Sequence, residues 1–160
     1  MKIGHGFDSH RLGPGRPLIL GGVLIPHDRG LEGYSDGDVL SHAVASAILG
    51  ALGKGDLGTH FPSSDTKFEG MSSLGILRQL ISLLDIESLQ LSNLDATVIA
   101  EEPRLAPFRD KMEGQISQSL NVSLKRINVK ITSTDGLGAI GKGEGIAAHA
   151  VVLLSEVEKS

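Results

Sequence analysis

Residues 38–52 read Asp-Val-Leu-Ser-His-Ala-Val-Ala-Ser-Ala-Ile-Leu-Gly-Ala-Leu, a segment with few polar positions. A run of this length predicts a largely buried helix, with Asp36 or Asp38 available as its N-terminal cap. Other elements must cover such a helix on several sides, because it is apolar nearly all round. Its imidazole, His42, needs a polar partner, since an unpaired polar group in an apolar environment is costly.

The segments around this helix predict a mixed β-sheet. Gly21-Gly22 between Leu18-Ile19-Leu20 and Val23-Leu24-Ile25 indicates a two-residue hairpin. Apolar spacing predicts further helices over residues 72–87 and 107–120, and strands over residues 94–100, 127–132 and 145–154. This order of elements favours an α/β (α+β) fold, a mixed β-sheet with helices packed on one face, in a single domain of residues 1–160.

The opposite face of this sheet needs a cover as well, because the predicted strands are apolar on both sides. Self-association through that face is the simplest solution. The small side chains of Ala147 and Ala148 would permit a close approach between copies of the chain.

Composition limits the functions that the chain can have. The formal net charge is −4 over 160 residues, whereas binders of nucleic acid or of membrane surfaces favour a basic face. We therefore expect no nucleic-acid partner and no membrane partner. No segment approaches the ~20 apolar residues of a membrane span, and the N-terminus lacks the apolar run of a signal peptide. The expected location is the cytoplasm, or a plastid if a transit peptide has been removed.

The absence of cysteine means that any bound metal must be held by His, Asp or Glu. Asp8 and His10 lie two residues apart, so in an extended segment both side chains project to the same side. His42 can supply a third ligand, and two histidines with one carboxylate leave an open fourth position on zinc, as in catalytic sites. An Asp-x-His pair also arises by chance among ordinary polar residues, and it is His42 in its apolar helix that favours the metal site. The other histidines are interpreted as ordinary polar residues: His5, His27, His60 and His149.

Two glycine-containing loops bear on phosphate binding. Ser35-Asp36-Gly37-Asp38 precedes the buried helix, and we interpret its two carboxylates as capping groups. Ser35, with helix-start amides nearby, could also hold a phosphate. Residues 141–145, Gly-Lys-Gly-Glu-Gly, lack the spacing of a nucleotide-binding P-loop and lead into a strand, so strand entry is the favoured interpretation.

Six stretches of the chain form a combined pattern. They are Ile3-Gly4-His5-Gly6-Phe7-Asp8-Ser9-His10, Ser35-Asp36-Gly37-Asp38-Val39 with His42, Gly55-Asp56-Leu57-Gly58, Phe61-Pro62, Ala100-Glu101-Glu102-Pro103-Arg104 and Gly143-Glu144-Gly145-Ile146-Ala147. Any one of them is weak, but the set in this order and spacing is highly specific. With it, the chain resembles the cyclodiphosphate synthase family nearly from end to end.

The resemblance implies an activity, its cofactors and an assembly. The family converts 4-diphosphocytidyl-2-C-methyl-D-erythritol 2-phosphate to 2-C-methyl-D-erythritol 2,4-cyclodiphosphate with release of CMP, in non-mevalonate isoprenoid biosynthesis. The implied cofactors are Zn²⁺, or a similar divalent transition metal, and a second divalent cation, Mg²⁺ or Mn²⁺. The implied assembly is a homotrimer with active sites built from two neighbouring subunits and with one sheet face toward the trimer axis.

The resemblance also implies roles for individual residues. Asp8, His10 and His42 match the zinc ligands of the family, and Asp135 matches its ligand for the second ion. Tyr34 and Ser133 match positions with a catalytic role. The implied substrate-binding residues are Asp8, Ser9, His10, Tyr34, Ser35, Asp56, Leu57, Gly58, Phe61, Pro62, Ser63, Ser64 and Asp65 around the metal and the methylerythritol, Ala100, Glu101, Glu102, Pro103, Arg104, Leu105 and Ala106 around the cytosine, and Thr132, Ser133, Thr134, Asp135, Ala139 and Lys142 toward the diphosphate and the central cavity.

Several positions depart from the family pattern. Tyr34 stands where His is usual, so it can donate a hydrogen bond but carries no positive charge. Ser63 stands where Asp is common, and Asp135 replaces a Glu that is one methylene longer. None of the departures affects the three predicted zinc ligands. They bear instead on the second metal and on the central cavity. Near the trimer axis, Ala139, Lys142 and His149 replace a Phe, an Arg and an acidic residue.

Two other functions are compatible with a metal site of this kind. A metal-dependent phosphohydrolase would cut a nucleotide diphosphate with water, using the same ligands. A non-catalytic trimer would store metal or bind isoprenoid diphosphates in its axial cavity. Residues 100–106 argue against both functions, because neither needs a cytidine pocket.

Overall fold

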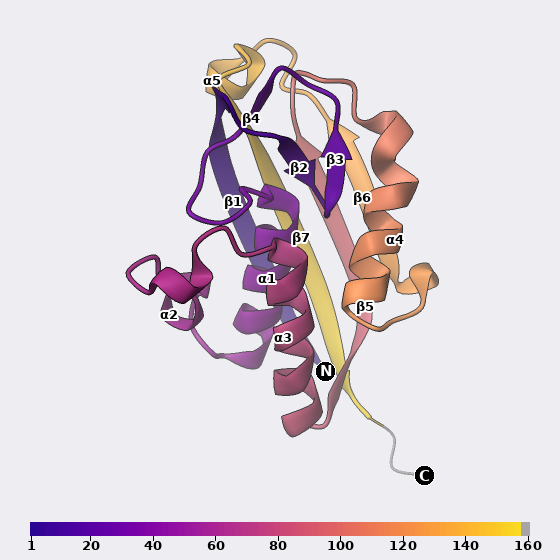
Figure 1. The fold of residues 1–160 in the computed structure, drawn as a ribbon. Coiled ribbons are helices and arrows are strands. Elements are labelled where there is room, and N and C mark those ends of the chain that lie inside the picture. Colours follow the sequence, from indigo (N-terminus) through magenta and orange to yellow (C-terminus); the bar gives the residue numbers. More distant parts are fainter. Residues whose placement is uncertain (158–160) are drawn as a thin grey trace.

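The computed structural model describes residues 1–157, and a five-stranded mixed sheet forms the centre of the fold (Figure 1). In spatial order its strands are β4 (Arg29–Leu31), β1 (Lys2–Pro14), β7 (Gly145–Glu156), β5 (Leu89–Ile99) and β6 (Ile127–Thr132). β5 and β6 run parallel, and the other neighbouring pairs are antiparallel. A hairpin of β2 (Leu18–Leu20) and β3 (Val23–Ile25) forms a separate two-stranded sheet.

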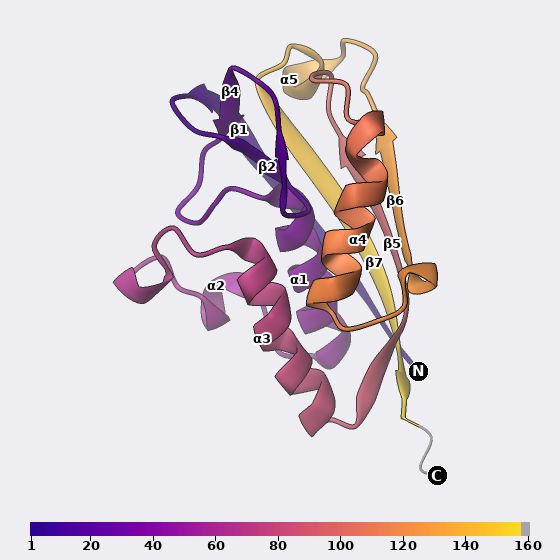
Figure 2. The same ribbon diagram turned by 45° about the vertical axis from the view of Figure 1, so that its right-hand side comes forward.

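Helices cover one face of the five-stranded sheet, as the two views in Figures 1 and 2 show. The three long helices are α1 (Val39–Leu52), α3 (Ser73–Ile86) and α4 (Arg109–Ser119). α1 packs on β1 and β7, α3 on α1 and β5, and α4 on β6. The predicted arrangement of a mixed sheet with helices on one face is thus confirmed. Shorter elements are α2 (Leu57–His60), α5 (Gly138–Gly141) and the 3-10 turns η1 (Thr66–Phe68), η2 (Ala106–Phe108) and η3 (Leu124–Arg126).

The sequence patterns predict most of these elements but not β1 and β4. The hairpin, the first two long helices and the strands β5, β6 and β7 are confirmed, and the helix predicted from residue 107 begins as the turn η2 before α4. The predicted element order is wrong at its start, because β1 precedes the hairpin and pairs with both β4 and β7. Glycine at positions 4, 6 and 13 hides this strand, since glycine has a low strand propensity. Within residues 1–157, no helix is both long enough and apolar enough to cross a membrane.

A buried carboxylate fastens the hairpin to the start of α1. Asp38 is the N-cap of α1, and its side chain accepts hydrogen bonds from Ser41 N at 3.0 Å and Ser41 Oγ at 2.7 Å. It also accepts from the backbone N–H groups of Gly21, at 2.9 Å, and Gly22, at 2.8 Å. Burying these donors without an acceptor would cost about 1–3 kcal/mol each. The capping role predicted for Asp38 is confirmed, and the same carboxylate positions the hairpin.

Two glycines in β1 let α1 lie directly on the sheet. A Cβ atom at Gly4 would stand 1.9 Å from the carbonyl oxygen of Ala47, and one at Gly6 would stand 1.9 Å from that of Ala43. Any side chain at these positions would push the helix away from the strand. Side chains alternate along a strand, so Asp8 and His10 follow the two glycines on the face that meets α1. The close contact between strand and helix therefore brings residue 42 of the helix near Asp8.

The second face of the sheet bears no helix in residues 1–157, and it is apolar only in part. Along β1 and β7 it presents Ile3, Phe7 and Val151, which are exposed, whereas β5 and β6 present the ion pair of Asp95 with Lys130. The expectation of strands that are apolar on both sides is therefore wrong for β5 and β6. Ala147 and Ala148 are both buried, and Ala148 aligns with Asp8 on the helix-covered face.

Candidate metal centre

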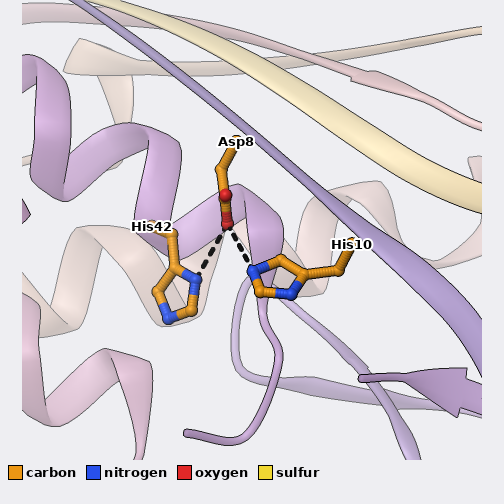
Figure 3. Close-up of side chains that lie close together, drawn as sticks. All are labelled: Asp8, His10 and His42. Carbon is orange, nitrogen blue, oxygen red and sulfur yellow. Dashed lines mark hydrogen bonds and ion pairs between the residues drawn. The ribbon is translucent and has the colours of Figure 1, made fainter. Parts of the chain in front are cut away.

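Three side chains from two elements converge on one point (Figure 3). Asp8 and His10 project from β1, and His42 projects from the first turn of α1. Asp8 Oδ2 lies 2.9 Å from His10 Nε2 and 2.9 Å from His42 Nδ1. The structure thus brings together the three residues that the sequence analysis predicts as zinc ligands.

The geometry and the chemistry of this cluster suit a divalent metal ion. One ligand atom from each residue lies within 4.8 Å of the others, and no fourth protein ligand belongs to the cluster within the described residues. Two imidazoles and one carboxylate are donors that zinc and similar transition metals accept, and three protein ligands leave room for a substrate or water oxygen. Asp8, His10 and His42 are thus a candidate site for a divalent metal.

Electrostatics favour the charged form of the carboxylate. Burial of Asp8 opposes its ionisation, but hydrogen bonds and charge from His10 and His42 hold its pKa well below the usual range. The hydrogen bond to Asp8 raises the pKa of His10, although burial works against that shift. Asp8 is therefore an anion at neutral pH and is ready to bind a cation.

Groups outside the cluster also act on the two imidazoles. A backbone hydrogen bond at Glu32 adds to the raised pKa of His10. His42 Nε2 lies 2.8 Å from Ser73 Oγ and 3.0 Å from Ser35 Oγ. Ser73 is the first residue of α3, and its hydroxyl donates to Asp36 Oδ1.

These contacts correct the prediction for Asp36 and add Ser73 to the residues around the candidate metal site. Asp36, interpreted from the sequence as a capping group for the buried helix, instead accepts hydrogen bonds from the N–H and the hydroxyl of Ser73 at the start of α3. The sequence analysis does not single out Ser73. The serine pair at residues 72 and 73 predicts only the beginning of a helix, and nothing local indicates contact with residues 36 and 42.

The cluster opens into a pocket of about 270 Å³. Eight of the predicted site residues line it together with His42: Asp8, His10, Tyr34, Ser35, Leu57, Gly58, Phe61 and Ser63. Ser46, Phe68, Met71 and Ile76, which the sequence analysis does not name, line it as well. Apolar walls of this kind lower the local polarity around a charged ligand, which strengthens its interaction with the metal.

Neighbouring groups act on Tyr34, which lines the pocket, and on the loop that carries it. Arg16 donates to the carbonyl oxygens of Gly33, at 2.5 Å, and Ser35, at 2.6 Å, and so holds the loop that carries Tyr34. Partial loss of hydration and the carboxylates of Glu69 and Asp65 raise the pKa of Tyr34 above its ordinary value, so its hydroxyl stays a neutral donor. Asp56 lies outside the pocket lining, and its Oδ1 accepts from Thr59 N and Thr59 Oγ1 at the start of α2.

The stretch that resembles a cytidine pocket begins at the level of Ser9 along the strands, because Ile99 aligns with Ala147 and Ala147 with Ser9. It follows β5, and a cis peptide bond joins Glu102 to Pro103. Arg29 donates to Glu102 Oε1 at 2.6 Å and to the carbonyl oxygen of Gly143 at 2.8 Å. Ala100 and Leu105 are buried, whereas the side chains of Glu101 and Glu102 are exposed. None of residues 100–106 lines the pocket at the metal site.

Thr132 ends β6 on the face of the sheet opposite the candidate metal site, and residues 133–135 follow it in a loop. Thr132 aligns with Ile99, Ile99 with Ala147, and Ala147 with Ser9. This row spans three strand spacings, about 14 Å in all, and Ser9 points away from the face that carries Asp8 and His10. Ser133 and Asp135 are exposed, and they hydrogen bond to one another at 3.1 Å. Within one chain, therefore, the segment of Ser133 and Asp135 does not join the pocket.

One pair of histidines is less ordinary than the sequence analysis predicts. His5 Nε2 lies 3.0 Å from His149 Nδ1 on the open face of the sheet. The ring of Phe7 lies 4.8 Å, centroid to centroid, from that of His149. The two histidines are 144 positions apart in sequence, and only the pairing of β1 with β7 brings them together.

These observations define a class: an α/β protein in which a strand and the helix on it bring two histidines and one carboxylate together as a candidate metal site that lines a pocket. The chain belongs to the YgbB family, whose pattern it matches over residues 1–155. It is 52% identical over 160 residues to the 2-C-methyl-D-erythritol 2,4-cyclodiphosphate synthase of Syntrophotalea carbinolica, and the match covers 100% of this chain and 98% of that protein.

Solved structures agree with this assignment. A 2C-methyl-D-erythritol-2,4-cyclodiphosphate synthase in its CDP-bound form matches with a TM-score of 0.88 and 36% identity, over 96% of this chain and 100% of that chain. The bifunctional IspDF from Campylobacter jejuni matches with a TM-score of 0.94 and 41% identity, over 98% of this chain. This chain spans 42% of that longer protein.

Proposed function

We propose that this chain is a phosphorus–oxygen lyase that converts 4-diphosphocytidyl-2-C-methyl-D-erythritol 2-phosphate to 2-C-methyl-D-erythritol 2,4-cyclodiphosphate and CMP, in the non-mevalonate route to isoprenoids. The observation that carries the proposal is the Asp8, His10 and His42 cluster at the base of a pocket, in a chain that matches the family over residues 1–155. The relative from Syntrophotalea carbinolica, which aligns with the whole chain, bears the name of this activity.

In this reaction the 2-phosphate of the substrate attacks the β-phosphorus, and the bond from that phosphorus to the CMP oxygen breaks. A phosphate monoester has its second pKa near 6, so at neutral pH the attacking group is already mostly dianionic and needs no general base. Asp8, His10 and His42 would hold zinc, which supplies positive charge to the diphosphate when bound. Folding the substrate so that its two ends meet supplies the orientation, which in ideal intramolecular cases contributes up to roughly 7–11 kcal/mol.

The pocket residues have distinct proposed roles. Tyr34, as a neutral donor, would hydrogen bond to a phosphate oxygen at the rim, and Ser35 would contact the same group. Leu57 and Gly58, which line the pocket, would surround the methylerythritol together with Asp56, whose Oδ1 already serves Thr59. The remaining proposed contacts in this part of the site are Ser9, Phe61, Pro62, Ser63, Ser64 and Asp65.

The proposed assembly is a homotrimer in which each active site uses two neighbouring subunits. Two observations support it. The segment of Thr132, Ser133, Thr134 and Asp135 begins three strands away from the metal cluster of the same chain, with Thr132 on the opposite sheet face, and it is largely exposed. The open face also exposes Ile3, Phe7 and Val151, which a partner would cover. In this arrangement Ser133 and Asp135, the latter with Mg²⁺ or Mn²⁺, would approach the diphosphate from the neighbouring subunit, residues 100–106 would read the cytosine, and Ala139 and Lys142 would face the axis.

A single experiment separates this activity from its alternatives. The purified chain is incubated with the substrate, Zn²⁺ and Mg²⁺ in oxygen-18 water, and CMP and the second product are examined by mass spectrometry. Cyclisation releases CMP and incorporates no label, because the attacking oxygen comes from the substrate. Phosphohydrolase activity would place the label on one of the products, and a storage protein would release no CMP. Either of the last two outcomes would overturn the proposal.

A further inference from the structure

Two hydroxyl groups lie near the ring nitrogen of His42 that faces away from Asp8. Ser73 Oγ is 2.8 Å from Nε2, and Ser35 Oγ is 3.0 Å from it. Only one of these hydroxyls has its proton committed elsewhere. Ser73 Oγ donates to Asp36 Oδ1, and an ionised carboxylate can only accept. A serine hydroxyl has a single proton, so toward His42 the oxygen of Ser73 can act only as an acceptor.

From this arrangement we propose that Asp36 and Ser73 are positioning residues that keep the proton of His42 on Nε2, so that Nδ1 stays free to bind the metal. The proposal rests on the metal site proposed above. Metal-ligating histidines are generally oriented in this way by a partner of their other nitrogen. Here the partner is a serine that a carboxylate orients, and Ser73 reaches both His42 and Asp36 from more than 30 positions along the chain.

In the metal-free protein, Asp8 would stabilise the other tautomer of His42, which carries its proton on Nδ1. A proton on Nδ1 would point at Asp8 Oδ2, 2.9 Å away, and would form a hydrogen bond to a charged acceptor. That proton would occupy the position that the metal needs. Asp8, itself a proposed ligand, therefore favours the form of His42 that cannot bind metal. The Ser73 oxygen opposes this, because an unprotonated Nε2 would place two lone pairs 2.8 Å apart.

Ser35 cannot select one tautomer of His42 in the same way. Its oxygen accepts the N–H of Gly37 at 3.3 Å, and within the described residues no contact takes its hydroxyl proton away from His42. Ser35 can therefore serve either tautomer by rotating its hydroxyl. Asp36, in contrast, is fixed by three donors: Ser73 Oγ and Asp38 N reach Oδ1, and Ser73 N reaches Oδ2 at 2.8 Å. Ser73 is fully buried, so water cannot readily replace its hydroxyl.

The chain offers a matched control in Ser41. Its hydroxyl also donates to a buried aspartate, Asp38 Oδ2, at 2.7 Å, and it precedes His42 on the same helix without a hydrogen bond to the imidazole. Ser41→Ala therefore removes a buried serine–aspartate hydrogen bond. It leaves intact the relay from Asp36 through Ser73 to His42. Any effect that comes merely from a loss of stability near α1 should be seen in this variant too.

The test uses the full chain, with Zn²⁺ as the probe, in competition with a chromophoric chelator. We expect Ser73→Ala to bind zinc about 10–100-fold more weakly than the parent, the usual effect of removing such a partner. Ser41→Ala should keep the parent affinity. Asp36→Asn is a second variant: its amide can donate to Ser73 Oγ, which frees the serine hydroxyl to donate to Nε2, so zinc binding should weaken here as well.

Nitrogen-15 spectra of labelled histidine, recorded before and during the zinc titration, report the tautomer directly. The parent should show a protonated Nε2 and an unprotonated Nδ1 at His42 without metal, and Ser73→Ala should move Nδ1 toward the protonated value. Equal zinc affinity and equal nitrogen shifts in the parent and in folded Ser73→Ala would overturn the relay. So would a parent with its proton on Nδ1, or a loss of affinity in Ser41→Ala as large as in Ser73→Ala. Failure of the metal site itself looks different, because then the parent and His42→Ala would bind zinc equally.

Discussion

The two regions that the sequence connects with phosphate chemistry differ in how complete they are within one chain. The cluster of Asp8, His10 and His42 sits on regular elements and is partly buried, and the outer nitrogen of His42 has hydroxyl partners. The segment of Ser133 and Asp135 is exposed and lies across the sheet, and its side chains bond chiefly to their own loop. In the proposed two-subunit site, one half is thus preorganised by the fold, and the other half would be presented to the neighbouring subunit.

The largest effect is expected from His42→Ala. It removes one of three proposed ligands, so zinc content should fall from about one ion per chain to nearly none, and cyclisation should be lost. Elemental analysis of purified protein and CMP release measure the two effects. A variant that kept its zinc would show that the preorganised half is not a metal site.

Gly6→Ala should disturb the same half without touching a ligand. The added Cβ would stand 1.9 Å from the carbonyl oxygen of Ala43, so α1 must move away from β1. We expect a loss of about 1–3 kcal/mol in the free energy of unfolding, and weaker zinc binding. Urea unfolding and chelator competition are the measurements.

The control for this change is Gly114→Ala in α4, where a new Cβ meets no atom within 4 Å. Alanine in a helix is favoured over glycine by about 0.5–1 kcal/mol, so this variant should be slightly more stable than the parent and should bind zinc normally. If Gly6→Ala behaved like Gly114→Ala, the close strand–helix contact would not determine the metal site.

Asp135→Asn probes the exposed half. Asp135 has a φ of 52° and Gly136 one of 79°, and asparagine accepts this left-handed backbone as readily as aspartate does. Only the charge changes, so turnover should fall about tenfold or more, equivalent to at least about 1.4 kcal/mol. Zinc content should be unchanged. An unaltered rate across a range of Mg²⁺ concentrations would show that Asp135 is only a turn residue.

Mixed trimers sharpen the comparison further. His42→Ala chains keep the exposed half, and Ser133→Ala chains keep the metal half. If each site combines the two halves from neighbouring subunits, an equal mixture should recover about a quarter of the parent rate, because one site in four pairs two intact halves. Verified mixed trimers without any recovered activity would mean that the halves do not meet across an interface.

The difference between the regions also explains what the sequence could predict. Asp8 and His10 are separated by two positions and His42 lies in a strongly apolar helix, so local patterns point to all three. Ser73 reaches His42 from 31 positions away, and Asp36 reaches Ser73 from 37, contacts that no local pattern contains. The strand β1 is not predicted, because its glycines weaken the strand pattern. The same glycines allow α1 to approach the sheet. The polar side chains of Asp95 and Lys130 were overlooked because Leu, Val and Ile dominate their strands.

The pairing of β1 with β7 has a consequence for the order of events during synthesis. Lys2 aligns with Leu154 and Arg11 with Gly145, so the strand that carries Asp8 and His10 is held by residues that the ribosome adds more than 130 positions later. Contacts this distant along the chain slow folding, because a large loop must close before they form. In a nascent chain, Asp8 and His10 therefore lie on a strand that still lacks its β7 partner, although β4 and α1 are already present. We therefore expect that a metal bound by Asp8 and His10 is captured late in folding, after translation has delivered β7.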